Sequence, residues 1–138
     1  TLTRSSDPLT SPDAEVIRGH LIRFNDQESG GIDFRPLQVI LHDPDGKTCG
    51  GLLGWTVWSW LHIESLWIDS ENRGQGWGTR ILTEAEAEAK DRDCEICDVD
   101  TFNFQALEFY QKAGYELFGT LSGIGKGTLE RYNLRKLL

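Results

Sequence analysis

The stretch of sequence that decides the fold is Asn72-Arg73-Gly74-Gln75-Gly76-Trp77-Gly78-Thr79. It stands between an apolar, strand-like segment at residues 60–68 and a helical pattern at about residues 80–91. Because glycine lacks a Cβ atom, this backbone can turn tightly and approach a ligand closely. The unpaired N–H groups of the following helix then converge where the helix dipole favours an anion, and Arg73 adds a cation. We therefore predict a loop that holds a pyrophosphate, in preference to a plain turn into a helix.

Two other phosphate-binding patterns compete for this role. A dinucleotide fingerprint, Gly-x-Gly-x-x-Gly, needs glycine where Thr79 stands, and the chain offers one βαβ unit where a full dinucleotide fold has two. Asp98 or Asp100 stands at a suitable distance downstream, so a nucleotide-binding domain stays open as a distant alternative. The pattern Gly-x-x-x-x-Gly-Lys-Ser/Thr fails at Gly125-Lys126, which lacks the earlier glycine and the hydroxyl.

The segments on either side of the loop predict an α/β (α+β) fold in a single domain over residues 1–138. Ser11 and Pro12 are typical of a helix N-cap and first helical position. A strand, a helix and a strand at about residues 61–101 form one central parallel crossover in a mixed, mostly antiparallel sheet with flanking helices. The predicted strands are residues 1–5, 34–42, 50–58, 60–68, 95–101, 115–121 and 128–134, and the predicted helices are residues 12–29, 80–91 and 103–113. The first helix carries an apolar stripe of Val16, Ile17, Leu21, Ile22 and Phe24.

Two motifs in order connect this layout to a known family. The first is Arg-x-x-Gly-x-Gly, formed by Arg73, Gly76 and Gly78. The second is Asn103-x-x-Ala106-x-x-Phe109-Tyr110-x-Lys112-x-Gly114-Tyr115. With them the sequence resembles the GNAT superfamily of acyl-CoA N-acyltransferases over about residues 34–121, although Trp77 replaces the usual aliphatic residue of the loop. The resemblance implies an N-acetyltransferase that moves an acetyl group from acetyl-CoA to a primary amine by direct attack in a ternary complex.

The resemblance also implies which residues bind coenzyme A. The pantetheine arm would lie in the gap between the strands on either side of the crossover helix. Asn103 would bond to the pantetheine, although a plain helix cap is the alternative, and Ala106 would leave room for it. Tyr110 would stand beside the sulfur, where a phenol can donate a proton to the leaving thiolate; its alternative is core packing beside Phe109. The backbone of Leu66, Trp67 and Ile68 would pair with the pantetheine, and Arg73 and the amides of Gly74, Gln75, Gly76, Trp77, Gly78 and Thr79 would bind the pyrophosphate.

A protonated amine must lose a proton before it attacks a thioester, so a base is expected near the end of strand 60–68. His62 and Glu64 alternate onto one face of that strand. Histidine has the better intrinsic pKa, and a carboxylate can act through water. For each residue, an ordinary polar role is an equal alternative.

Composition limits the partners. The 138-residue chain has a net charge of −8, which argues against nucleic acid and is compatible with a cationic small-molecule or peptide acceptor, or merely with solubility. The sequence contains no run of about 18 apolar residues, so no membrane span is expected. A cytoplasmic protein is expected. The oligomeric state is open, with a homodimer as one option.

The cysteines give no sign of special chemistry. Cys94 and Cys97 have the C-x-x-C spacing without a second ligand pair, so we expect small buried hydrophobes and no metal site. Cys49 lies in an apolar strand without a neighbouring base, which disfavours a covalent route. The remaining alternatives are transfer of another acyl group and a non-catalytic acyl-CoA-binding or regulatory module.

Overall fold

The computed structural model describes all 138 residues, in two compact units, residues 1–33 and 34–138, which we treat separately. The first unit contains helix α1 (Pro12–Ser29), which begins as predicted: the Ser11 hydroxyl accepts a hydrogen bond from the Ala14 amide at 3.3 Å. It ends at Gly30, whose φ of 80° is left-handed. None of its residues is buried, including the apolar stripe.

The strand predicted at residues 1–5 was wrong, because residues 1–8 adopt no regular structure. This segment has a single apolar side chain, Leu2, which is fully exposed. A strand there would bury almost no apolar surface to offset the entropy of ordering it.

None of the helices in the chain combines the length and apolar character that crossing a membrane requires.

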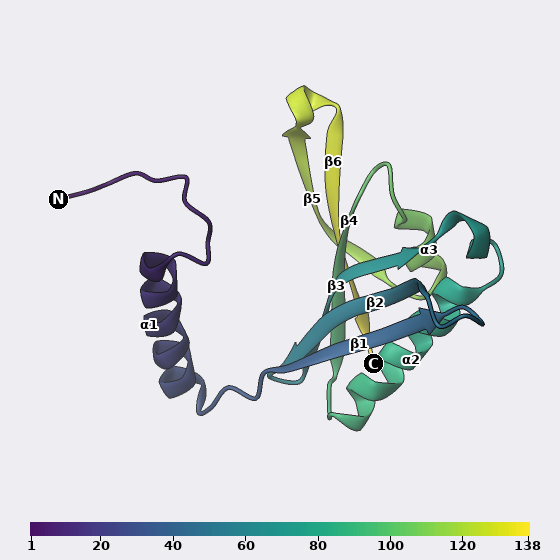
Figure 1. Cartoon of the computed structure of the whole chain (residues 1–138), viewed down its shortest axis with the longest axis horizontal. Coiled ribbons are helices and arrows are strands. Elements are labelled where there is room, and N and C mark those ends of the chain that lie inside the picture. The colour runs from purple at the N-terminus through teal and green to yellow at the C-terminus, as the bar shows by residue number, and fades with distance from the viewer. The chain divides into compact units, whose positions relative to one another are not determined.

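The second unit is a mixed six-stranded sheet in the order β1-β2-β3-β4-β6-β5 (Figure 1). Only β3 and β4 pair in parallel, across the helix α2 (Trp77–Asp91), and every other pairing is antiparallel. This confirms the predicted α/β fold with its central crossover. The strands are β1 (Arg35–His42), β2 (Thr48–Val57), β3 (Trp60–Ile68), β4 (Ile96–Phe102), β5 (Glu116–Ile124) and β6 (Leu129–Leu137).

The last helix, α3 (Leu107–Lys112), is shorter than the predicted helix at residues 103–113. Residues 103–106 form a turn, in which the side-chain oxygen Oε1 of Gln105 accepts a hydrogen bond from the Phe102 amide at 2.8 Å and the Thr101 hydroxyl accepts one from the Ala106 amide at 3.2 Å. These side-chain bonds stabilise the turn and satisfy two amides that a helix beginning at residue 103 would leave without an intrahelical partner. The helix ends before Gly114 with φ of 94°, as predicted.

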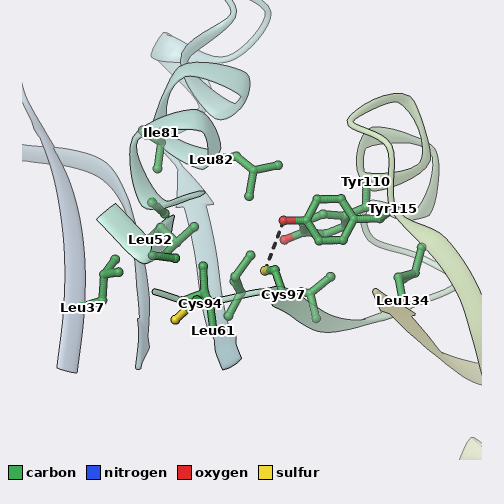
Figure 2. Packing of buried hydrophobic residues seen from close by; sticks show 14 residues of the cluster. Leu37, Leu52, Leu61, Ile81, Leu82, Cys94, Cys97, Tyr110, Tyr115 and Leu134 are labelled. Carbon is green, nitrogen blue, oxygen red and sulfur yellow. Dashed lines mark hydrogen bonds between the residues drawn. The ribbon is translucent and has the colours of Figure 1, made fainter. Parts of the chain in front are cut away.

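The core lies between one face of the sheet and helix α2 (Figure 2). Leu52, Leu61 and Ile63 of the sheet are fully buried together with Leu82 of the helix. Cys94 and Cys97 are buried and form no disulfide, as expected for small apolar side chains. A buried polar network crosses this core: the Tyr115 hydroxyl donates to Glu86 at 2.8 Å and lies 3.2 Å from the Cys97 sulfur, and Lys136 bonds to the same carboxylate at 2.9 Å.

Strands β3 and β4 separate halfway along their length. Their pairing runs from Trp60 opposite Ile96 to Ile63 opposite Val99 and then stops, while β4 continues against β6. At the same point β3 has a bulge, because Leu53 and Gly54 of β2 pair with residues 65 and 63 and leave residue 64 without a partner. A bulge bends the strand and redirects the extra side chain. The gap between β3 and β4 is therefore built by backbone pairing, and it opens at Glu64.

Candidate active site

The glycine loop exposes its backbone to a cavity. Gly74 and Gly76 have φ angles of 73° and 81°, which disfavour side chains, and a Cβ atom added to either would meet no protein atom within 4 Å. Gly76 is the N-cap of α2 and has no side chain to cap the helix, so the amides of the first helical turn remain free for a ligand. The turn before the loop is held by Asp69, which accepts the Asn72 amide at 3.0 Å.

Arg73 lies at the junction of the loop and strand β3. Its Nε donates to the carbonyl oxygen of Ile68 at 2.9 Å, which leaves the two terminal nitrogens free to meet an anion. The loop backbone and Arg73 thus form an open, donor-rich cradle that fits a pyrophosphate. Trp77, the departure from the family pattern, is half-buried at the start of α2, with the Arg80 guanidinium 4.3 Å from its ring centroid.

Three adjoining cavities lead from this loop into the gap between β3 and β4. The loop cavity shares Ile68, Arg73, Gly78 and Phe109 with a middle cavity of about 550 Å³. The middle cavity, lined also by Trp67 and Phe104, shares Leu66, Gln105 and Ala106 with an inner cavity. The inner cavity is lined by Ile63, Glu64, Ser65, Leu66, Val99, Asp100, Thr101, Gln105, Ala106 and Tyr110.

Tyr110 closes the inner end of this groove. Its side chain is 4% exposed and packs edge-on against Phe109 and Tyr115, with ring centroids 5.1 and 5.6 Å apart. Burial, reinforced by the nearby Cys97 thiol, raises the pKa of Tyr110 to about 12. Tyr110 therefore packs in the core and also lines the inner cavity. Its phenol stays protonated in neutral solution. No other residue hydrogen-bonds its hydroxyl, which remains available to a ligand.

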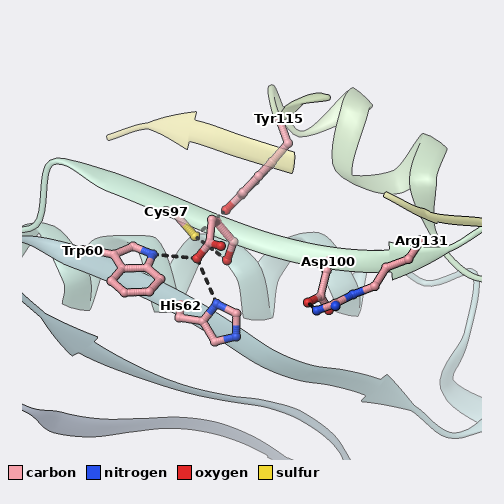
Figure 3. A network of polar contacts seen from close by, with 7 residues as sticks. Trp60, His62, Cys97, Asp100, Tyr115 and Arg131 are labelled. Carbon is pink, nitrogen blue, oxygen red and sulfur yellow. Dashed lines mark hydrogen bonds and ion pairs between the residues drawn. The ribbon is translucent and has the colours of Figure 1, made fainter. Parts of the chain in front are cut away.

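The two candidate bases lie in different surroundings. Glu64, at the bulge, is exposed and lines the inner cavity together with Tyr110. His62 does not line that cavity; its Nδ1 lies 2.9 Å from Oδ1 of Asp98 on the neighbouring strand (Figure 3). Asp100, which does line the cavity, pairs with Arg131. The inner end of the groove thus combines a phenol with carboxylates.

Asn103 stands apart from the groove. It neither caps α3, whose N-cap is Ala106, nor lines any of the three cavities. Its side-chain nitrogen donates to the carbonyl oxygen of Thr128 at 3.3 Å and so ties the turn before α3 to the β5–β6 hairpin. The helix-cap alternative was therefore wrong, because α3 begins four residues later than the motif suggested.

Sequence reasoning missed several residues that line the groove. Phe104 and Gln105 were expected on the first turn of a helix, and their turn conformation instead places both at the groove. Phe109 was considered only as a packing partner, yet it lines two cavities, and a Cβ at Gly78 would press on its ring at 3.2 Å. Asp100 was weighed only for a dinucleotide site. The sequence signal for Asp100 was its alternation with Asp98 on the second strand of the crossover, which places both carboxylates on one face.

Comparison with known proteins agrees with this geometry. Residues 8–115 match the acetyltransferase (GNAT) family. The chain is 36% identical over 110 residues to a blasticidin-S acetyltransferase of Streptomyces morookaense, covering 77% of this chain and 81% of that protein. It is 33% identical over 122 residues to the acetyltransferase Atu2258 of Agrobacterium fabrum, covering 88% and 89%. A crystal structure of an acetyltransferase from Agrobacterium tumefaciens superposes with a TM-score of 0.91 at 30% identity, over 100% of both chains.

The chain therefore belongs to the GNAT family of acetyltransferases, and it is an acyltransferase enzyme. Members of this family use acetyl-CoA as the acetyl donor. The loop fits that donor, because an open cradle of free amides with an adjacent guanidinium suits a pyrophosphate, and the groove behind it leads to the buried phenol.

Proposed function

We propose that this protein transfers the acetyl group of acetyl-CoA to a primary amine by direct attack within a ternary complex. The observation that carries the proposal is the groove, which begins at the anion-binding loop and ends between Glu64 and Tyr110. Such a groove suits a long donor with a phosphate at one end and a reactive thioester at the other.

In this proposal the loop amides of residues 74–79 and Arg73 bind the pyrophosphate. The pantetheine arm occupies the middle cavity and bonds to the backbone of Leu66, Trp67 and Ile68, which does not pair with strand β4. Ala106 leaves room where the middle and inner cavities meet. Asn103 contributes indirectly, by holding the turn that carries Gln105 and Ala106.

The reaction needs a base for the ammonium and an acid for the thiolate, and the groove has a group for each. A base near Glu64 takes a proton from the ammonium, and the freed amine attacks the thioester carbonyl. A C–N bond forms and the C–S bond breaks. The Tyr110 hydroxyl donates to the departing thiolate, and the second proton of the amine nitrogen returns through water to Tyr110.

The acceptor is proposed to be a cationic amine. The net charge of −8 attracts cations over a distance, and Glu64 and Asp100 place carboxylates at the inner end of the groove. The 36% identical relative is named for blasticidin S, which makes that compound the first acceptor to test. Simple amines, peptides and other aminated antibiotics complete the panel.

The test measures release of coenzyme A from acetyl-CoA against this panel. Glu64→Gln removes charge and basicity with little change of shape. It should raise KM for a cationic acceptor, lower kcat, or both, and leave acetyl-CoA affinity intact. Binding of acetyl-CoA without turnover of any acceptor would favour a regulatory module instead. Faster turnover of a longer acyl-CoA would overturn the choice of acetyl donor.

A further inference from the structure

His62 and Asp98 form a side-chain pair at the edge of the gap between β3 and β4. The two residues are opposite each other in the parallel register, one position before the last paired residues. The distance from His62 Nδ1 to Asp98 Oδ1 is 2.9 Å, and the Trp60 indole nitrogen donates to the same oxygen at 2.6 Å. Both the histidine and the aspartate side chains are mostly covered, at 22% and 27% exposure.

This arrangement determines which ring nitrogen carries the proton. An ionised carboxylate is only an acceptor, and the indole N–H is only a donor. The hydrogen bond between His62 and Asp98 therefore requires a hydrogen on Nδ1, and in the neutral imidazole the lone pair then lies on Nε2. The rings of Trp55 and Trp60 lie 4.9 and 5.8 Å from the imidazole and limit its rotation.

The pairing places the other ring nitrogen, Nε2, on the face of the sheet that carries Asp98 and Asp100. Asp98 and Asp100 are two residues apart on β4 and so face the same side, and Asp100 lines the inner cavity. Figure 3 shows His62 and Asp100 on the same side of β4. The Nδ1 atom of His62 is the nitrogen that contacts Asp98, so Nε2 is the nitrogen left without this partner. Because His62 does not itself line the inner cavity, an ammonium held at Glu64 would pass its proton to Nε2 through water.

We propose that Asp98 is the positioning residue of this enzyme: it holds His62 as the Nδ1–H tautomer, so that Nε2 accepts the proton of the acceptor ammonium. This inference rests on the proposed function. In the step, the N–H bond of the ammonium breaks and the proton joins Nε2. The Asp98 carboxylate stabilises the resulting imidazolium, which later passes its proton to water.

The other charged groups around this pair do not replace Asp98. On β3 the neighbouring charge is Glu64, which we assign to holding the ammonium. On β4, Asp100 forms an ion pair with Arg131. On β6, Arg135 lies opposite Asp98 in the antiparallel register. The packed residue of β2 is Trp55, which has no charge. Asp98 is thus the carboxylate with direct access to Nδ1.

The first experiment reads the tautomer without any acceptor. The chain has three histidines, so nitrogen NMR of protein labelled with ¹⁵N-histidine shows few signals. The signals that disappear in the His62→Gln variant belong to His62. We expect neutral His62 to carry its hydrogen on Nδ1 in the native protein. In Asp98→Asn the amide can donate to Nδ1, so the Nε2–H tautomer should gain population. His20 and His42 serve as internal controls and should keep their shifts.

The second experiment uses turnover with blasticidin S, or with the best acceptor of the panel. Asp98→Asn should lower kcat about 10²-fold, a loss typical of a disabled general base, with acetyl-CoA affinity unchanged. In a His62→Ala background the same substitution should have no further effect, because Asp98 acts only through His62. Asp45→Asn, at the exposed β1–β2 turn, is the surface control for loss of one carboxylate.

Distinct outcomes would overturn the inference and the proposed function. A native His62 protonated on Nε2, or a tautomer that does not respond to Asp98→Asn, would remove the positioning role. Additive losses in the double variant would assign Asp98 a role independent of His62. Absence of turnover with every acceptor would count against the proposed function alone, since the tautomer is measured without it.

Discussion

At the scale of single residues, two positions carry most of the functional argument. Gly76 has a left-handed backbone and open space around it, so only a ligand would meet a side chain placed there. Tyr110 is buried in the core yet presents its hydroxyl to the inner cavity. Each residue satisfies a structural and a chemical requirement at once, and substitutions can separate the two.

Gly76→Val tests the cradle. A β-branched side chain would block the approach of the pyrophosphate to the loop amides, and acetyl-CoA affinity should fall about 10²-fold, or about 2.7 kcal/mol, by calorimetry. Gly46→Val is the matched control, since Gly46 has a φ of 83° and equally open space. Both variants carry the same backbone strain, but only Gly76→Val should lose binding. Arg73→Ala should lose less than about tenfold, since it removes one exposed cation. Unchanged affinity for acetyl-CoA in a folded Gly76→Val protein would show that the loop does not bind the pyrophosphate.

Tyr110→Phe tests the acid. The ring and its packing remain, so fold and acetyl-CoA affinity should change little, while kcat should fall about 10²–10⁴-fold. Tyr132→Phe is the control, because its hydroxyl bonds to Glu130 outside the three cavities. If Tyr110→Phe turns over as the native enzyme does, the tyrosine has only a packing role.

At the scale of elements, the separation of β3 from β4 creates the site. The parallel pairing stops at Ile63, and the bulge follows at residue 64. The turn at residues 103–106 then brings Gln105 and Ala106 to the opening, held by the hydroxyl of Thr101. Backbone pairing, bulge and turn together leave unpaired backbone of β3 beside a groove, which suits an extended ligand arm.

Ala106→Leu tests whether the donor threads through this opening. The larger side chain would fill the narrow part shared by the middle and inner cavities, and it should reduce acetyl-CoA affinity about tenfold with little loss of stability. Ala87→Leu adds the same volume on the exposed face of α2 and should bind acetyl-CoA normally. Equal affinities of the two variants in calorimetry would show that the donor does not pass beside Ala106.

At the scale of the whole molecule, buried thiol and phenol groups make the free energy of unfolding depend on pH in the alkaline range. Burial raises the pKa of the Cys97 thiol from 9.0 to about 12, and it raises the pKa of Tyr110 from 10.0 to about 12. Burial also raises the pKa of Tyr115, which adjoins both residues. The unfolded chain releases these protons at the ordinary pKa values, whereas the folded chain keeps them. The stabilisation is therefore complete below about pH 9 and is lost as pH rises toward 12.

Urea unfolding between pH 8 and pH 10.5 measures this effect. By pH 10.5 the Cys97 thiol alone should lower the free energy of unfolding by about 2 kcal/mol. Cys97→Ala will cost stability at every pH, because it leaves a small cavity, but its stability should decline less steeply above pH 9. Parallel curves for the native and variant proteins would show that the thiol does not ionise on unfolding in this range.

The sequence by itself determined the family and the order of the central elements, and it predicted the loop and Tyr110 as parts of the site. These features depend on local chemistry: glycines that permit left-handed backbone, apolar periodicity, and two motifs in order. Only the tertiary structure decided the bulge at Glu64, the start of α3 at Leu107 and the pairing of His62 with Asp98. Those features depend on which residues of separate segments come into register, and 36 positions separate His62 from Asp98 in the chain.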